Sequence, residues 1–201
     1  MIPIGSHAGV QANTEVPNAP AMSCLRAGTR DLHEALEADP RVMRQFETRA
    51  GLAKLLSSWY GFLLPFEVEL IRNAVPFSDF IRSRSKLHAL CQDLAVHGIS
   101  PSRVRQCEDL PEVGSCQQVF GALYVLEGST LGGRMLAGQI EKHLGLHDGV
   151  GYSFFLGYGI RTGSMWHEFS DMANRFLAAS ASEAISAARS TFSCLHRWLA
   201  A

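Results

Sequence analysis

Apolar residues recur along this chain with the spacing of α-helices almost throughout. Between Thr48 and Ala74, leucine and aromatic residues return every three or four positions, which is the period of one helix face. Similar spacing predicts further helices at residues 23–38, 78–96, about 119–144, 164–178 and 182–198. Only residues 152–156 alternate in the manner of a strand. We therefore expect an all-α, single-domain bundle of six to eight helices.

Local signals indicate where these helices begin, bend and end. Ser23 is a candidate N-cap for the first helix, and Asp39-Pro40 should end it, because a residue before proline avoids the α region. Pro65 should kink the second helix. The glycine-rich segment 149–163 suggests an ordered loop. We divide the chain into a flexible tail, residues 1–22, and one helical domain, residues 23–201.

The composition narrows the class of protein. With 47% hydrophobic and 18% charged residues, the chain can bury a core, and its net charge of -1 provides no basic face for nucleic acid. No apolar run approaches the 18 residues of a membrane span, and the N-terminus lacks the features of a signal peptide. The five cysteines are widely spaced without a CxxC pair, which favours reduced thiols in a cytoplasmic protein without a zinc site.

His33 lies at the border of the apolar stripe on the first predicted helix. At 100° per residue, leucines flank it on one side, while Arg26 and Arg30 lie about 20° and 60° away on the other. Heme would suit such a border, since its iron takes a neutral imidazole, its faces take apolar contacts and its propionates take arginines. Glu37, one turn later, could fix the histidine tautomer. A partly buried histidine beside solvated arginines explains the same pattern.

The glycine-rich run GSTLGG interrupts the helix predicted around residue 130. Gly128, Gly132 and Gly133 each cost about 1 kcal/mol relative to alanine inside a helix, so their clustering needs a reason. Gly128 and Gly132 share one face, where a flat or bulky ligand could approach the backbone, and Tyr124 precedes them by one turn. Close packing between helices accounts for the glycines equally well.

Taken together, these segments resemble the heme oxygenase family, and more narrowly the bacterial branch associated with bacteriophytochromes. The resemblance covers nearly the whole chain after Met22. It is carried by LRAGTRDLHEALE (25–37), YGFLLPFEVEL (60–70), LYVLEGSTLGGRMLAGQI (123–140), SFFLGYGIRTGSMWHEFSDMAN (153–174) and TFSCLHRWL (191–199).

The resemblance implies a role for individual residues. His33 would be the axial ligand of the heme iron, hydrogen-bonded to Glu37, with Arg26 and Arg30 near the propionates. Gly128, Gly132 and Gly133 would form the distal helix, so that heme is sandwiched between this glycine-kinked helix and the first helix.

One position departs from the animal-type members of the family. They carry an aspartate that organises water where this chain has Ser129, so the distal network would be built through Ser129, Thr130, backbone or water. A basic residue from the C-terminal helices often completes the propionate site, and Arg161 and Arg175 are candidates for it.

The implied activity is oxidative cleavage of heme to biliverdin, expected to be the IXα isomer, with release of Fe²⁺ and CO. Heme b would be substrate and cofactor together, with O2 as co-substrate. Electrons would come from a ferredoxin or a flavoprotein reductase, because no dinucleotide fingerprint is present, and biliverdin could pass to a bacteriophytochrome.

Other functions stay open at this point. One is a non-catalytic heme-binding or heme-delivery protein on the same fold. Another is a thiamine-degrading relative that uses Cys116 and Glu127, and a third is a purely structural helical partner.

Overall fold

The computed structural model describes residues 20–201, and within them the chain is all-helical, without strands. Its α-helices are α1 (Ala21–Ala38), α2 (Pro40–Met43), α3 (Arg49–Asn73), α4 (Ser78–Arg82), α5 (Leu87–Val96), α6 (Cys116–Leu144), α7 (Thr162–Phe176) and α8 (Ser182–Ala200). Short 3₁₀ helices are η1 (Arg44–Glu47), η2 (Val75–Phe77), η3 (Pro101–Arg103), η4 (Ser153–Leu156) and η5 (Gly159–Arg161). The predicted all-α, single-domain fold is confirmed.

The first two long helices follow their sequence signals closely. α1 ends where Asp39 becomes the N-cap of α2, and the Thr48 side chain caps α3 by accepting a hydrogen bond from Gly51 N–H. Pro65 lies inside α3, which continues through it. The N-cap of α1 is Pro20 rather than Ser23, so the helix includes two residues assigned to the tail. The rest of that tail, residues 1–19, lies outside the described residues.

Three expectations about the other elements are wrong. The predicted helix 78–96 is two helices, α4 and α5, separated by residues 83–86. α6 runs from Cys116 to Leu144 without interruption, because glycine adopts helical angles readily and packing outweighs its entropic cost. The possible strand at 152–156 is largely the 3₁₀ helix η4.

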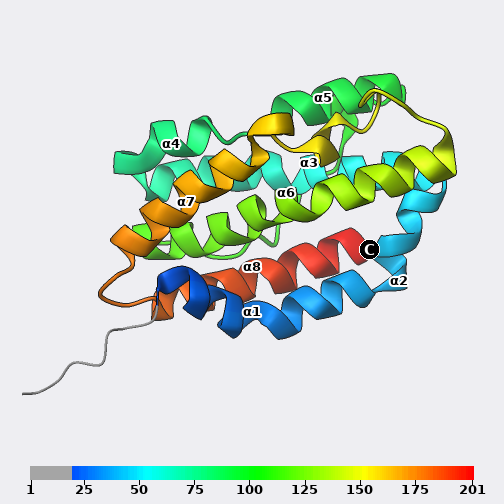
Figure 1. Cartoon of the computed structure of the whole chain (residues 1–201). Coiled ribbons are helices and arrows are strands. Elements are labelled where there is room, and N and C mark those ends of the chain that lie inside the picture. Colours follow the sequence, from blue (N-terminus) through cyan, green and yellow to red (C-terminus); the bar gives the residue numbers. More distant parts are fainter. Residues whose placement is uncertain (1–19) are drawn as a thin grey trace, which may run out of the picture.

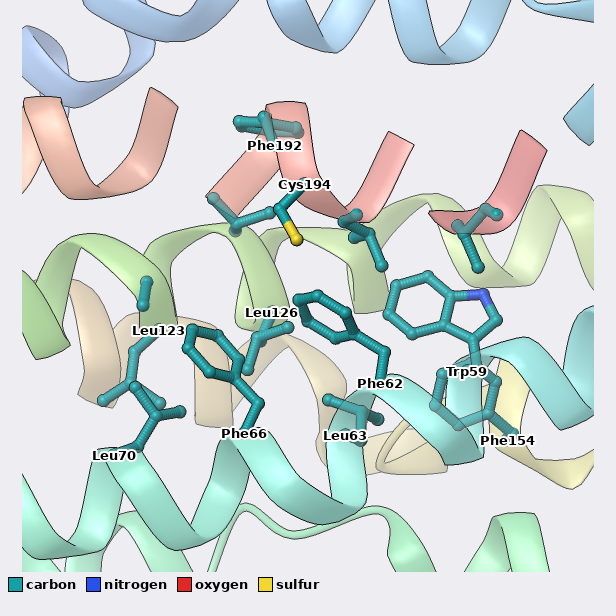
Figure 2. Packing of buried hydrophobic residues seen from close by; sticks show 14 of the residues in the cluster. Trp59, Phe62, Leu63, Phe66, Leu70, Leu123, Leu126, Phe154, Phe192 and Cys194 are labelled. Atoms are coloured by element: carbon teal, nitrogen blue, oxygen red, sulfur yellow. The ribbon is translucent and has the colours of Figure 1, made fainter. Parts of the chain in front are cut away.

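The core forms between α3, α6 and α8. Figure 2 shows α3 presenting Trp59, Phe62 and Phe66 toward α6 and α8, where Leu126 and Cys194 are among the buried side chains. Figure 1 shows α8 between α6 and α1, with α3, α4 and α5 on the other side of α6. α6 is therefore the central helix of the described domain, with a different neighbour on each face.

Glycines allow α8 to lie very close to both of its neighbours. A Cβ atom at Gly121 of α6 would overlap the carbonyl of Ala184, and one at Gly28 of α1 would lie 2.7 Å from the Ile185 side chain. Real Cβ atoms essentially never approach this closely, so a side chain at Gly121 would force the α8 backbone to move, and one at Gly28 would force the Ile185 side chain to shift. α8 thereby fixes the separation of α1 and α6.

Among residues 20–201, none of the helices has the length and hydropathy that a membrane span requires.

Candidate functional site

His33 projects from α1 at the edge of its contact with α8. Its side chain is 53% exposed, and its Nδ1 atom lies 3.4 Å from the Glu37 carboxylate. Its ring meets Phe192 of α8 edge-on, at 5.8 Å between centroids. A carboxylate beside Nδ1 favours the tautomer with the proton on that nitrogen. Nε2 is then the nitrogen with a lone pair for a metal.

The two arginines predicted beside His33 are both exposed on α1. Arg26 and Arg30 precede His33 by two turns and one turn, so the three side chains lie along one flank of the helix. The buried side of α1 is formed by Ala21, Leu25 and Thr29. The predicted border between an apolar stripe and a cationic flank is therefore present in the fold.

The opposite flank of α1 is attached to α8. Asp31 receives two hydrogen bonds from Arg189, at 2.7 and 2.9 Å, and the same arginine donates to the Gly28 carbonyl. This bidentate pair lowers the pKa of Asp31, with the hydrogen bond as the main cause. It holds α1 in one rotational setting, which keeps His33 on the side away from Asp31.

The glycines of α6 meet two kinds of surroundings. A Cβ atom at Gly132 would meet nothing within 4 Å, and one at Gly128 would meet only the Trp166 ring at 4.0 Å. A Cβ atom at Gly133, by contrast, would overlap the carbonyl of Phe155 in η4. The open glycine face thus consists of Gly128 and Gly132. The grouping of Gly133 with them is corrected, since packing against η4 accounts for that glycine.

Apolar and aromatic side chains surround the open glycine face. Leu131 and Met135 are 47% and 61% exposed, which is unusual for large apolar side chains on a central helix. Tyr124, which was predicted to line this face, lies 6.1 Å from Trp166 of α7 between ring centroids. Sequence reasoning missed Trp166, because its proximity to Gly128 arises from the crossing of α7 over α6 (Figure 1).

Ser129 does not extend into the open face. Its hydroxyl donates to the Leu126 carbonyl at 2.8 Å, and the Thr130 hydroxyl donates in the same way to the Glu127 carbonyl at 2.6 Å. Ser129 also borders an internal cavity that contains the buried side chains of Arg84 and Glu127. The sequence suggested nothing of this charged cluster, because its members are far apart along the chain.

The remaining candidates have different outcomes. Cys116 and Glu127 are eleven residues apart on one helix, which separates their backbones by roughly 16 Å and argues against a shared nucleophilic site. Arg175 donates to the Asp171 carbonyl of its own helix, at 3.2 Å. Arg161 is exposed at the end of η5. Within the described residues, no contact joins Arg161 or Arg175 to His33.

The residues present fit heme as a substrate. On α1 there are an imidazole nitrogen with a lone pair and a cationic flank, and on α6 there is a glycine face where a side chain would find open space. These are the groups that iron, propionates and a flat apolar ring each need. The fit rests on the chemistry of these side chains and on the uncovered backbone at Gly132.

Comparison with known proteins gives matches over most of the chain. The family model for heme oxygenase matches residues 19–201. Among solved structures, a heme oxygenase from Neisseria meningitidis, described with NO and CO bound, has a TM-score of 0.74 at 22% identity, with 90% of each chain covered. A heme oxygenase from Leptospira interrogans has a TM-score of 0.74 at 20% identity, covering 90% of this chain and 99% of that one. Among curated protein sequences, none matches significantly.

Proposed function

Because this chain belongs to the heme oxygenase family, we propose that it binds heme b through His33 and cleaves it to biliverdin with release of Fe²⁺ and CO. The observation that carries the proposal is the setting of His33, half-exposed beside Glu37 on the flank of α1 that the Asp31–Arg189 pair leaves open. Heme supplies the iron at which O2 reacts, and the porphyrin ring is itself the substrate.

Each part of the site has a separate task in this proposal. His33 supplies a neutral ligand whose orientation is set by Glu37 and by the edge of Phe192. Gly128 and Gly132 leave room on α6 for the porphyrin and O2 to approach the backbone. Tyr124 contributes to the wall of this face through its contact with Trp166.

Arg26 and Arg30 set the rotation of the heme within its plane. Both guanidinium groups extend from one flank of α1, so they would bind the propionates at one edge of the ring. That rotation determines which meso carbon faces the open glycine surface. We propose the IXα isomer of biliverdin as the product.

The reaction needs electrons from another protein, and we propose a ferredoxin or a flavoprotein reductase in the cytoplasm. We also propose that the chain belongs to the bacteriophytochrome-associated branch and that a bacteriophytochrome, which is a photoreceptor, receives the biliverdin. Both assignments rest on the resemblance of the sequence segments 25–37 and 123–140 to that branch.

Heme titration of the His33→Ala variant tests the proposal. We expect the wild type to give a Soret spectrum of a histidine-ligated heme and to form a verdin product when O2 and an electron donor are added. His33→Ala should lose both the ligation spectrum and turnover. His88→Ala is the matched control, because His88 is an exposed histidine on another helix, α5.

The same experiment separates the proposal from its main alternative. A wild-type protein that binds heme through His33 but forms no verdin would be a heme-binding or heme-delivery protein. The serine at position 129, where animal-type members carry a carboxylate, is the feature that favours this alternative. If His33→Ala binds heme with the wild-type spectrum, the ligand assignment is wrong.

A further inference from the structure

Part of the loop that follows α6 folds back along the buried side of that helix. This part, residues 151–158, includes η4, and Figure 1 shows it between α5 and α6. Tyr152, Phe154 and Phe155 are buried and belong to the hydrophobic core. We call residues 151–158 the backing segment.

The backing segment contacts α6 at three positions that are three residues apart. The pairs are Glu127 with Tyr158, Thr130 with Gly157, and Gly133 with Phe155. The first pair is a hydrogen bond of 2.6 Å from the Tyr158 hydroxyl to the carboxylate, and the other two are close approaches at a glycine. As α6 advances from residue 127 to 133, its partners run back from 158 to 155. The two segments are therefore antiparallel and in a fixed register.

The same stretch of α6 carries the open glycine face. Gly128 and Gly132 alternate along the helix with the three residues that touch the backing segment, and a Cβ atom at Gly132 would meet nothing within 4 Å. Gly133 follows Gly132 directly, so a displacement of the helix at Gly133 moves the open face as well. The distance of this face from a ligand therefore depends on what supports α6 from behind.

Asp93 of α5 binds the backing segment from the other side. Its side chain is buried, and its Oδ1 atom accepts hydrogen bonds from the N–H and the hydroxyl of Ser153, while Oδ2 accepts from Phe154 N–H, each at 2.8 Å. One turn later in the chain, His97 Nε2 donates to the Gly151 carbonyl, also at 2.8 Å. Two side chains from the end of α5 thus hold the backing segment at residues 151, 153 and 154.

A carboxylate in this position is costly to bury. Burial raises the pKa of Asp93, and the hydrogen bonds from Ser153 and Phe154 lower it only in part. Among residues 20–201, Asp93 takes part in no ion pair. Buried charges without an ion pair are unfavourable unless several strong hydrogen bonds satisfy them. The cost of burying Asp93 is therefore matched by the fixed backbone position of η4.

We propose that Asp93 is a positioning residue for the reaction. Through the backing segment it holds the stretch of α6 between Glu127 and Gly133, and so it sets the depth of the space beside Gly132 in which heme and O2 are bound. The inference rests on the proposed function, because heme is the ligand assigned to the open glycine face.

A purely structural role for Asp93 makes a different prediction. It would lower the stability of the whole domain when changed, without a particular effect on α6. Thr48→Ala serves as the matched control, because it removes the hydrogen bond of 3.0 Å that caps α3 and lies at an exposed site away from the backing segment.

The first test measures amide hydrogen exchange in the heme-free protein by mass spectrometry. Asp93→Asn replaces one acceptor oxygen with a donor that opposes an N–H of η4, so the backing segment should loosen. We expect exchange to accelerate roughly tenfold in residues 127–135, relative to Thr48→Ala, although Asp93 binds no residue of α6 directly. Ser153→Ala keeps two of the three hydrogen bonds and should give a smaller acceleration in the same residues.

The second test records the infrared C–O stretch of CO bound to the ferrous heme complex. This band reports the surroundings of a diatomic ligand, which the proposed function places beside the open glycine face. We expect a shifted or second band in Asp93→Asn, because α6 is no longer held at one distance, and the wild-type band in Thr48→Ala. A change in overall stability alone would not produce this difference between the two variants.

The outcomes separate the inference from the proposed function. Equal exchange in residues 127–135 for Asp93→Asn and Thr48→Ala would overturn the inference, and so would a wild-type C–O band in Asp93→Asn. If Asp93→Asn does not fold, Ser153→Ala decides in the same way, since exchange no faster than in Thr48→Ala would overturn the inference. Absence of heme binding by the wild type would refute the proposed function, whereas the exchange experiment would still show whether Asp93 holds α6.

Discussion

At the scale of single residues, two adjacent glycines of α6 have different surroundings. A side chain at Gly132 would enter open space, whereas one at Gly133 would overlap the Phe155 carbonyl. We expect Gly133→Ala to destabilise the protein by about 1–3 kcal/mol, because η4 must move. Gly132→Ala should be neutral or stabilising by up to about 1 kcal/mol, because alanine favours helix. Urea unfolding of both variants measures the difference.

A larger side chain at Gly132 should affect ligand binding rather than folding. Gly132→Leu is expected to keep the helical circular dichroism of the wild type and to lose heme or O2 binding. Normal binding of both by this variant would mean that the open glycine face is not the distal surface. Equal unfolding free energies for Gly132→Ala and Gly133→Ala would contradict the packing role assigned to Gly133.

The arginines of α1 make a separate prediction about the reaction product. Arg26→Ala removes one of two cations on the flank of His33, so heme should take a second in-plane orientation more often. We expect mainly IXα biliverdin from the wild type and a measurable increase in β or δ isomers from the variant, resolved by chromatography. Glu47→Ala is a control at an exposed charged position in η1. A wild-type product that is mainly β or δ would overturn the assignment of Arg26 and Arg30.

The positions of these residues on α1 were predictable because they lie within a single helix. The spacing of Arg26, Arg30, His33 and Glu37 depends only on helix geometry, so the sequence alone predicts a shared flank. The buried contacts of Glu127 with Arg84, Lys86 and Tyr158 could not be predicted in this way. These residues come from separate parts of the chain, and only the tertiary fold brings them together.

At the scale of elements, the junction between α1 and α2 depends on one carboxylate. Asp39 caps α2 by accepting from Arg41 N–H, and it also binds the Arg41 guanidinium at 2.6 Å and His196 Nε2 of α8 at 2.8 Å. The hydrogen bonds from Arg41 are the main reason that the pKa of Asp39 lies well below its usual range. This one side chain therefore connects α1, α2 and α8.

The low pKa of Asp39 predicts how stability depends on pH. Because the folded pKa lies below the unfolded value of about 3.9, the charged carboxylate contributes its full stabilisation above that pH. The contribution is lost as pH falls from about 4 toward the folded pKa. We expect Asp39→Asn to be less stable than the wild type at pH 6 in urea unfolding, and the gap to narrow below pH 4. A gap that is constant over this range would show that the charge is unimportant.

Helix ends were predictable where a capping residue or proline marks them in the sequence. They were not predictable where packing against other helices determines them. Asp39-Pro40 and Thr48 act through their own backbone, and both mark helix boundaries in the structure. α6 continues through GSTLGG, where Gly133 packs against η4, and hydrophobic periodicity does not reveal such a contact. The break at residues 83–86 places Arg84 and Lys86 beside the buried Glu127 carboxylate, so a tertiary interaction accompanies the end of α4.

At the scale of the whole molecule, α8 lies between α1, which carries His33, and α6, which carries the open glycine face. Arg189 and Ile185 of α8 contact α1, and Ala184 of α8 contacts α6 at Gly121. Figure 1 shows α8 between these two helices. α1 carries His33, whereas α6 carries the open glycine face. A heme bound by both helices would therefore link α1 to α6 directly, in addition to their link through α8.

This connection predicts that heme stabilises the protein as a whole. At a free heme concentration 100 times the Kd, binding to the folded state adds about 2.7 kcal/mol. For a domain of this size that corresponds to a rise in Tm of roughly 5–10 °C. Gly132→Leu should abolish the rise because it fills the space for the ring, and His33→Ala should reduce it by weakening ligation. His88→Ala should show the full rise. A wild-type Tm that does not change with saturating heme, or an equal rise in Gly132→Leu, would show that heme does not bind between α1 and α6.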